Sequence, residues 1–279
     1  MTELDPASAR HHRQVVQLLE RGNVVVLTGA GLSTASGIPD YRDREGRWKR
    51  KQPVGHREFL ASAAVRRRYW ARSFLGWPVV GQAQPGRGHR ALADLEARGR
   101  IALTVTQNVD GLHQKAGSRA VLELHGGVAC VVCLACCGHY PRSEVQDWMR
   151  AANPAFADVM ATAAPDGDAD AAEGFDESFA APDCPACGGM LKPDVVFFGD
   201  SVPKARVGAV STAIDAAAGL LVVGSSLMVY SGYRFAEYAH RQGKPVMAIN
   251  LGMTRADHLF AAKVERDCGE SLASMLAES

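Results

Sequence analysis

Two pairs of cysteines have the spacing of zinc-binding knuckles. They are Cys133-Leu-Ala-Cys136 and Cys184-Pro-Ala-Cys187, and Gly188-Gly189 after the second pair lets the chain turn back under an ion. Four thiolates complete a tetrahedral shell and leave no position for water or substrate. We therefore expect a structural Zn²⁺ ion and look for the chemistry elsewhere. Cys130 and Cys133 form another C-x2-C pair, so spacing alone leaves the first two ligands open.

A glycine-rich loop follows the first apolar segment. Residues 23–28 predict a buried strand, and Gly29-Ala30-Gly31 comes directly after it. Glycines at such a turn let backbone amides approach a pyrophosphate, so the loop indicates dinucleotide binding. Thr34 stands where the third glycine of G-x-G-x-x-G would be. A dehydrogenase also needs an acidic residue closing a second strand about 20 residues on, where this chain has a polar loop from Asp40.

Polar side chains follow two further predicted strands. Gln107, Asn108 and Asp110 come after a strand at 101–106, and His125 comes after a strand at 121–124. Because α/β sheets bind ligands at the carboxyl ends of their strands, Asn108, Asp110 and His125 are candidates for chemistry. Each has a structural alternative: an Asn or Asp here is commonly a turn residue or helix cap, and a single His is more often structural. Their combination favours chemistry.

The elements that position these residues predict an α/β fold. Strands at 23–28, 101–106, 219–223 and 246–250 alternate with helices near 7–21, 88–98, 204–217, 233–242 and 269–277. Such alternation implies a parallel sheet covered on both faces. The cysteine-bearing segment interrupts this pattern.

Charge is unevenly distributed in two places. Between Ala151 and Leu191 there is no Lys or Arg while acidic residues accumulate, which predicts a long mobile insertion at 157–183. We interpret it as a solvated loop rather than a substrate lid. Arg66-Arg67-Arg68 and Arg72 lie in a predicted helical segment that ends at Phe74-Leu75, and such a run is usually an exposed helix face.

Composition limits the class of protein. With 279 residues, 47% of them hydrophobic, the chain can fill a large domain and a small module. A formal net charge of +1 argues against nucleic acid as a partner, and no apolar run approaches the roughly 20 residues of a membrane span. The N-terminus lacks a secretory or transit pattern, and the odd number of cysteines, 7, fits a reducing compartment. We expect a cytoplasmic protein.

Together and in this order, the motifs resemble those of sirtuins, which are NAD-dependent protein lysine deacylases. The resemblance runs from about Val15 to Cys268. It rests on Gly29-Ala-Gly-x-Ser33, Ser36-Gly-Ile-Pro-Asp-Tyr-Arg42, Thr106-Gln-Asn-x-Asp110, Leu124-His-Gly126, both cysteine pairs, Lys192–Gly199, Gly224–Leu227 and Asn250. It implies a Rossmann-like NAD-binding domain of residues 1–126 and 199–279, with a smaller zinc-ribbon module, residues 127–198, inserted. Sirtuins place the first zinc cysteine eight residues after the catalytic histidine, which implies Cys133, Cys136, Cys184 and Cys187 as ligands and leaves out Cys130 and Cys137.

Within the family, the chain is most similar to the class II branch, which includes a mitochondrial sirtuin. The residues that carry this similarity are Tyr69-Trp-Ala-Arg72, Gly76-Trp-Pro78, Lys115-Ala-Gly-Ser118, Pro165-Asp-Gly-Asp168 and Tyr230-Ser-Gly-Tyr-Arg234. Ser231 stands where most sirtuins carry proline, beside the acyl-lysine groove. The resemblance therefore leaves the preferred acyl group open.

The resemblance also implies a role for each site residue. In sirtuin chemistry the acyl oxygen of lysine attacks C1′ of the nicotinamide ribose as nicotinamide leaves. Asn108 and Asp110, with Ile38, would orient nicotinamide and its ribose, and His125 would be the general base. The other NAD contacts implied are Gly29, Ala30, Gly31, Ser33, Asp40, Tyr41, Arg42, Gln107, Gly224, Ser225, Ser226, Asn250 and Cys268. Val195–Gly199 and Val229–Ser231 would pair with a peptide that carries the acylated lysine.

Three other functions are compatible with parts of the sequence. Mono-ADP-ribosyl transfer to protein shares every step up to the loss of nicotinamide. A dinucleotide-binding dehydrogenase is disfavoured by Thr34 and by the missing acidic ribose ligand. A zinc-ribbon interaction module without catalysis would leave Asn108, Asp110 and His125 unexplained. The sequence makes no prediction of oligomeric state.

Overall fold

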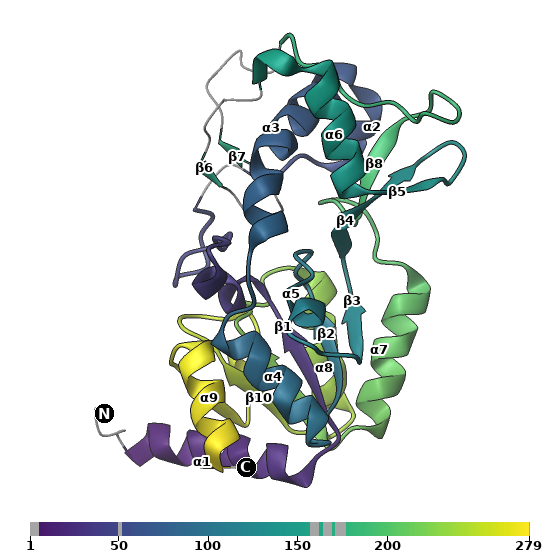
Figure 1. Cartoon of the computed structure of the whole chain (residues 1–279). Coiled ribbons are helices and arrows are strands. Elements are labelled where there is room, and N and C mark those ends of the chain that lie inside the picture. Colours follow the sequence, from purple (N-terminus) through teal and green to yellow (C-terminus); the bar gives the residue numbers. More distant parts are fainter. Residues whose placement is uncertain (1–5, 50–51, 157–161, 164–168, 171–176, 279) are drawn as a thin grey trace.

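A six-stranded parallel sheet carries the larger part of the fold (Figure 1). The computed structural model describes residues 6–49, 52–156, 162–163, 169–170 and 177–278. The strands lie in the order β11-β10-β9-β1-β2-β3, and each neighbouring pair is parallel. Their bounds are β1 Val24–Thr28, β2 Ile101–Thr106, β3 Val121–Glu123, β9 Gly219–Val223, β10 Val246–Ile249 and β11 Ala262–Val264.

Successive residues of β1 point into two different hydrophobic cores. Val24 and Val26 pack with α1, α4 and α9, whereas Val25 and Leu27 pack with α7 and α8. Side chains alternate between the faces of a strand, so an entirely apolar strand needs helices on both sides. The predicted α/β, Rossmann-like sheet is confirmed. The helix bounds are α1 Pro6–Arg21, α4 Arg87–Ala97, α5 Leu112–Lys115, α7 Lys204–Ala216, α8 Tyr230–Arg241 and α9 Cys268–Glu278.

A smaller unit lies beyond the carboxyl ends of these strands (Figure 1). Its three-stranded antiparallel sheet has the order β5-β4-β8, with β4 Gly126–Cys133, β5 His139–Pro141 and β8 Leu191–Val195. The helices beside it are α2 His56–Ala61, α3 Ala63–Gln82 and α6 Arg142–Ala152. The short elements are the 3₁₀ turns η1 Ala30–Leu32, η2 Thr34–Ser36, η3 Pro154–Phe156 and η5 Asp257–Leu259, and the strands β6 Thr162–Ala163 and β7 Ala169–Asp170.

The core of the smaller unit includes residues from two distant parts of the sequence. Trp70 and Phe74 of α3 pack with Val131 of β4 and Met149 of α6. Part of the range 1–126, which we assigned to the larger domain, therefore contributes to the core of the inserted segment. The domain limits at 126 and 199 stay a prediction.

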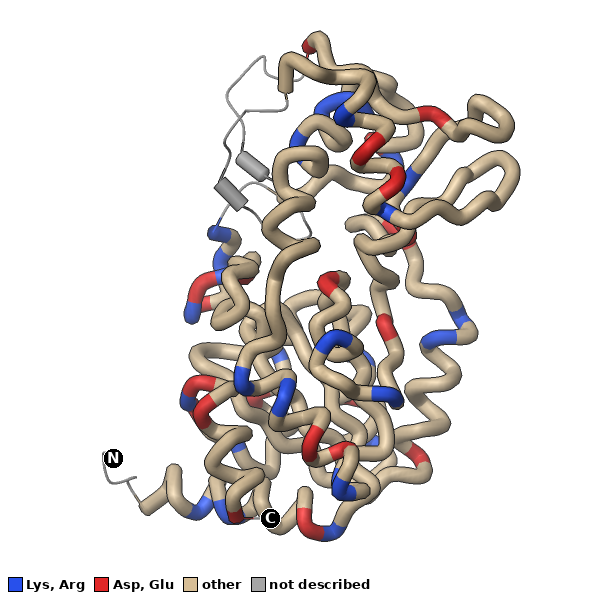
Figure 2. Tube along the Cα trace, viewed as in Figure 1, with Lys and Arg blue, Asp and Glu red and all other residues tan. Residues whose placement is uncertain are grey.

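Positive and negative charges are mixed along the described part of the chain. Figure 2 shows Lys and Arg interspersed with Asp and Glu along the described trace, in keeping with the net charge of +1. Most of the acidic insertion predicted at 157–183 lies outside the described residues. Within the described part of the chain, every helix is too short or too polar to cross a bilayer.

Helix α3 continues past the point where we expected it to end. The prediction placed its end at Phe74-Leu75, but the helix reaches Gln82 with Pro78 inside it. Proline has no amide hydrogen, so the carbonyl four residues earlier, that of Phe74, loses its helical donor. Gln146 Nε2 of α6 donates to this carbonyl at 2.9 Å. A side chain from another helix thus replaces the missing bond.

A buried arginine strengthens the same contact between α3 and α6. Arg142 donates to the carbonyl and the hydroxyl of Ser73 at 3.1 and 3.2 Å and to Gln146 Oε1 at 2.6 Å. Its guanidinium also lies 5.0 Å from the centre of the Trp77 ring. Burial lowers the pKa of Arg142 to about 10, so the side chain is still charged at neutral pH. The cation joins the two helices through hydrogen bonds and a ring face.

Gln146→Ala removes the donor to Phe74 and an acceptor of Arg142 at once. Both partners are buried, so we expect the free energy of unfolding to fall by about 2–3 kcal/mol. Urea unfolding followed by tryptophan fluorescence measures the change. Ser143→Ala, at an exposed position of the same helix, is the matched control and should stay close to the wild type. Equal stabilities for the two variants would show that the bond across Pro78 is not needed.

Candidate active site and metal centre

A cavity of about 790 Å³ opens at the point where the order of the sheet reverses. The chain passes from β1 to β2 and β3 on one side, and later from β9 to β10 and β11 on the other. Loops diverge at such a point, which makes it the usual ligand site of an open α/β sheet. Of the predicted site residues, those that line the cavity are Gly29, Ala30, Gly31, Asp40, Tyr41, Arg42, Gln107, Asn108, His125, Gly224, Ser225, Ser226, Asn250 and Cys268. Ser33, Ile38 and Asp110 are not among its lining residues.

The glycines after β1 are required by the neighbouring loop. A Cβ on Gly29 would lie 2.7 Å from the Cβ of Ser225, and a Cβ on Gly31 would lie 3.0 Å from the carbonyl oxygen of Gly224. The amide of Gly31 donates to that same oxygen at 2.9 Å. The sequence led us to expect this amide to face a phosphate. It is instead directed to the carbonyl of the neighbouring loop, and the predicted phosphate contacts of Gly29, Ala30 and Gly31 stay a prediction.

Asn108 is held by a chain of hydrogen bonds that leads to Asp110. Its Nδ2 donates to the carbonyl of Gly29 at 3.1 Å and to Ser33 Oγ at 3.0 Å. The Ser33 hydroxyl in turn donates to Asp110 Oδ2 at 2.7 Å, and Asp110 Oδ1 accepts the amide of Leu112 at 3.0 Å. Both hydrogens of the Asn108 amide are used, which fixes the side chain and leaves its oxygen as the acceptor for a ligand.

His89 and His113 are two buried histidines without a predicted role. They lie next to the hydrogen-bonded residues Ser33 and Thr28. His89 Nδ1 accepts the amide of Gly86 at 3.2 Å, and its Nε2 lies 3.4 Å from Ser33 Oγ. His113 Nε2 lies 2.9 Å from Thr28 Oγ1. Burial lowers the pKa of both imidazoles, that of His113 to about 3, so both are neutral at pH 7. No sequence signal pointed to His89, because the capping-box pattern is a Ser or Thr followed three residues later by Glu or Gln, whereas this helix begins with Gly86 and has His89 at that place.

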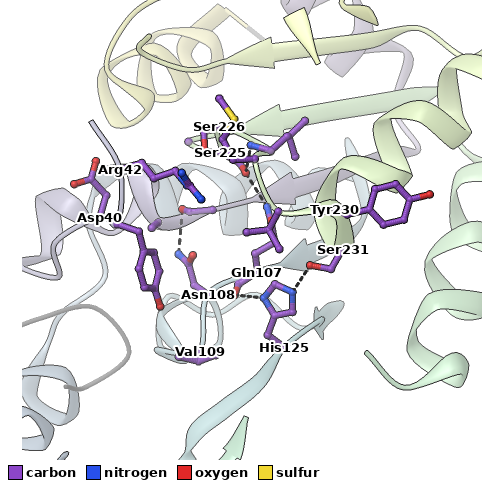
Figure 3. A pocket seen from close by; sticks show the side chains of 18 of the residues that line it. Asp40, Arg42, Gln107, Asn108, Val109, His125, Ser225, Ser226, Tyr230 and Ser231 are labelled. Carbon is purple, nitrogen blue, oxygen red and sulfur yellow. Dashed lines mark hydrogen bonds between the residues drawn. The ribbon is translucent and has the colours of Figure 1, made fainter. Parts of the chain in front are cut away.

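His125 presents an unprotonated nitrogen to the cavity (Figure 3). Its Nδ1 lies 2.9 Å from the carbonyl oxygen of Gln107, which only a protonated nitrogen can satisfy. The lone pair is therefore on Nε2, which accepts the hydroxyl of Ser231 at 2.8 Å. Burial lowers the pKa of His125, although the bond to Gln107 acts in the opposite direction. The ring is neutral at pH 7 and its Nε2 can accept a proton.

Gln107 joins the loops that meet at the cavity. Its Nε2 donates to Ser225 Oγ at 2.8 Å and to the carbonyl of Thr28 at 3.2 Å. The side chain thus connects the ends of β1 and β2 with the loop after β9. Its contact with NAD stays a prediction.

The segment 40–49 folds back on itself at one side of the cavity. Arg42 pairs with Trp48 in an antiparallel bridge, and its guanidinium lies 4.1 Å from the centre of the Trp48 ring. Asp40 forms an ion pair with Lys49. The rings of Trp48 and Tyr41 pack on Phe198, with centroids 5.6 and 6.2 Å from it. The loop is anchored to the strand edge that follows β8.

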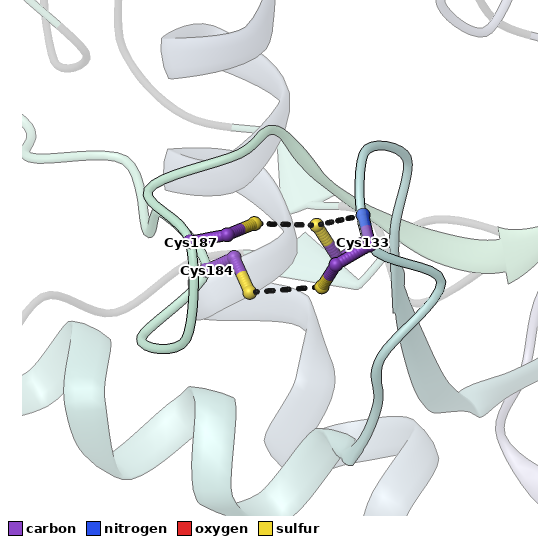
Figure 4. A group of neighbouring side chains, drawn as sticks. Cys133, Cys184 and Cys187 are labelled. Atoms are coloured by element: carbon purple, nitrogen blue, oxygen red, sulfur yellow. Dashed lines mark hydrogen bonds between the residues drawn. The ribbon is translucent and has the colours of Figure 1, made fainter.

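Four cysteine sulfurs converge in the smaller unit (Figure 4). Cys133 and Cys187 have their Sγ atoms 3.6 Å apart, and Cys136 and Cys184 have theirs 3.7 Å apart. Zn–S bonds of 2.3 Å at tetrahedral angles separate sulfurs by about 3.8 Å. The amides of Ala135 and Cys136 point to Cys133 Sγ at 3.4 and 3.5 Å. These distances fit one structural zinc ion.

Strand geometry keeps Cys130 away from this cluster. In β4 the residues Cys130 and Val132 are half-buried, whereas Val131 and Cys133 are buried. Residues three apart in a strand point to opposite faces. Cys130 and Cys133 therefore cannot hold the same ion, and the C-x2-C pair that the spacing left open is excluded.

Comparison with known proteins agrees with this geometry. Residues 29–231 match the Sir2 family. An "NAD-dependent protein deacetylase" of Xanthomonas axonopodis pv. citri is 53% identical over 270 residues, which is 96% of this chain and 92% of the relative. The "NAD-dependent protein deacylase Sirt4" of Drosophila melanogaster is 47% identical over 286 residues, again 96% of this chain and 92% of the relative. The solved structure "Sir2-p53 peptide-NAD+" superposes with a TM-score of 0.74 at 30% identity and covers 95% of this chain and 97% of that one.

We expect one tightly held zinc ion per chain, bound by Cys133, Cys136, Cys184 and Cys187. Cys184→Ser leaves three thiols and an incomplete shell for the ion, so the smaller unit should fail to fold, whereas Cys130→Ser should keep this ion. Metal analysis after passage over a chelating resin, together with limited proteolysis, distinguishes the two. A zinc-free Cys130→Ser chain beside a fully loaded Cys136→Ser chain would overturn the ligand set.

Proposed function

The chain belongs to the Sir2 family, and we propose that it removes acyl groups from protein lysines with NAD as the co-substrate. Bound NAD supplies an electrophilic ribose carbon as nicotinamide leaves, and the products are nicotinamide, free lysine and O-acyl-ADP-ribose. One observation carries the proposal. The unprotonated Nε2 of His125 faces the same cavity as the fixed carboxamide of Asn108 and the loop Gly29–Gly31.

Asn108 and Asp110 have different parts in this proposal. Asn108 lines the cavity, and its free oxygen can accept a hydrogen bond from the nicotinamide carboxamide. Asp110 lies behind it and acts through Ser33, whose hydroxyl connects the two side chains. A group held in one orientation lowers the barrier because the entropy of positioning has already been lost on folding. Asp110 is then a positioning residue.

His125 is proposed as the general base. Its neutral Nε2 can take a proton from a ribose hydroxyl, which prepares that oxygen for attack on the acyl carbon. In this structure the Ser231 hydroxyl fills the place of that hydroxyl at Nε2. The substrate therefore has to displace Ser231, whose side chain lies beside the predicted path of the acyl group.

The peptide is proposed to bind between two segments that line the cavity, Val195–Gly199 and Val229–Ser231. The first segment is held in place by bonds to its neighbours. The amide of Val196 donates to the carbonyl of His125 at 2.8 Å, and the carbonyl of Phe198 accepts the amide of His56 at 2.9 Å. An extended chain added to such an edge gains main-chain hydrogen bonds with little dependence on its sequence.

Product analysis tests the proposal against the other reactions. Incubation with NAD and an acylated peptide should give O-acyl-ADP-ribose and free lysine in equal amounts. Protein-bound ADP-ribose without acylated product would contradict it. We propose a cytoplasmic location, because 7 cysteines with zinc-binding spacing fit a reducing compartment better than a disulfide framework.

Asp110→Asn and His125→Ala should block different steps. Asp110→Asn weakens the hold on Ser33 and Asn108, so exchange of labelled nicotinamide into NAD should slow roughly 10- to 100-fold, the kinetic equivalent of one charge-assisted hydrogen bond. His125→Ala should lower free-lysine formation by about 10²–10⁴-fold, as expected for the loss of a general base, while exchange continues. Both rates are measured with acyl peptide present.

Ser33→Ala is the matched variant for the positioning role, because it cuts the connection and leaves both Asp110 and Asn108 in place. It should reproduce the slow exchange of Asp110→Asn. NAD binding, measured by calorimetry, should persist in all three variants. If His125→Ala binds NAD but loses exchange as fully as turnover, its late role as a base is wrong.

The acyl preference should reflect Ser231. We expect kcat/KM for acyl groups longer or more polar than acetyl to equal or exceed that for acetyl, because a hydroxyl rather than a proline ring lies at this position. Ser231→Ala should lower kcat/KM for polar acyl groups more than for acetyl. A panel of acyl peptides analysed by mass spectrometry gives both values. An acetyl peptide ranked far above every longer chain would contradict the expectation.

A further inference from the structure

A second group of metal-ligating side chains lies on the outward face of the three-stranded sheet. It consists of Cys130, His139 and Asp194, whose ligating atoms all lie within 4.8 Å of one another. Cys130 and Asp194 are half-buried and His139 is exposed. The catalytic proposal and the four-cysteine cluster use none of these residues.

The register of the sheet brings the three residues together. Cys130 is on the middle strand β4, and Val132 of that strand pairs with His139 of β5, so His139 lies diagonally across from Cys130 on the same face. On the other side Val131 pairs with Pro193 of β8, and Asp194 follows it where the register shifts. Each strand contributes one ligand, so the group exists only when the sheet is formed.

The sulfur–nitrogen distance in this group fits a tetrahedral ion. Cys130 Sγ and His139 Nδ1 are 3.5 Å apart. Zn–S and Zn–N bonds of 2.3 and 2.0–2.1 Å at the tetrahedral angle place these atoms about 3.5–3.6 Å apart. One thiolate, one imidazole and one carboxylate are the ligand types that Zn²⁺ accepts. Three protein ligands leave the fourth position to water, and the exposed His139 gives access from solvent.

We propose that Cys130, His139 and Asp194 form a second, exchangeable Zn²⁺ site. On binding, the Cys130 thiol releases its proton to solvent, and the thiolate and the Asp194 carboxylate together balance the charge of the ion. The site differs in kind from the four-cysteine cluster. It has an open coordination position and one thiolate, and it lies on the opposite face of β4.

The position of Asp194 connects this site with the peptide edge. The next residues, Val195 and Val196, line the cavity, and the amide of Val196 bonds to the carbonyl of His125. An ion held here joins β5, β4 and β8 beside that edge. Because it binds only the folded sheet, it stabilises the native state by an amount that rises with the logarithm of its concentration above the dissociation constant.

Metal titration of the full chain, without an affinity tag and already carrying its first zinc ion, tests the proposal. Equilibrium dialysis against Zn²⁺ should raise the content from one ion to two per chain, and added Co²⁺ should give the absorption of a tetrahedral site with one thiolate. Cys130→Ser and His139→Ala should each weaken the second ion by more than about 100-fold, since removing a ligand costs more than removing its supporting contacts. Asp194→Asn should weaken it too.

Cys137→Ser, which removes an exposed thiol outside the group, is the matched control and should still bind two ions. Every variant should keep its first zinc ion, which shows that the smaller unit is folded. The proposal is overturned if the wild type stays at one ion, if Cys130→Ser and His139→Ala still bind two, or if Cys137→Ser loses the second ion equally.

Discussion

The backbone contact between the loops after β1 and β9 is the constraint on which the rest of the site depends. Gly31 donates to the carbonyl of Gly224, and a Cβ on Gly224 would lie 2.5 Å from the amide nitrogen of Leu32. Gly224 also has φ +60, which favours glycine. The loops after β1 and β9 are therefore in close contact. The positions of these loops fix the side chains that form hydrogen bonds with them. Asn108 is held by the carbonyl of Gly29, and Gln107 by Ser225.

Desolvation sets the charge of the groups behind and within the cavity. His89, His113 and His125 are each neutral at pH 7 because burial lowers the pKa of each imidazole. A neutral His89 can accept an amide at Nδ1, which an imidazolium could not do. A neutral His125 keeps a lone pair on the nitrogen that faces the cavity. The same desolvation thus suits His89 to its structural hydrogen bond and His125 to the chemical role proposed for it.

The smaller unit supports the cavity through elements that are far apart in the sequence. Helix α3 reaches it from the N-terminal third of the chain, and Gln146 and Arg142 hold that helix across Pro78. Strands β4 and β8 leave the cysteine cluster and run directly to His125 and to the peptide edge. A structural zinc ion that holds the ends of these strands would stabilise the position of His125, the proposed general base, without touching the substrate. This gives a physical reason for a metal site so distant from the chemistry.

The sequence by itself predicted the parallel sheet, the two C-x2-C pairs and the order of the site motifs. The strand Val24–Thr28 begins with four apolar residues in a row, and paired C-x2-C spacing is set by the metal, so both signals are local. Only the tertiary structure decided which face Cys130 takes, how α3 continues through Pro78, and that His89 and His113 stand behind Asn108. Each of these depends on a partner distant in the sequence: the pairing of β4, the donor from Gln146, or the buried hydroxyls of Ser33 and Thr28. Local patterns carry no information about such partners, because burial and hydrogen bonding across the fold arise only when the elements pack.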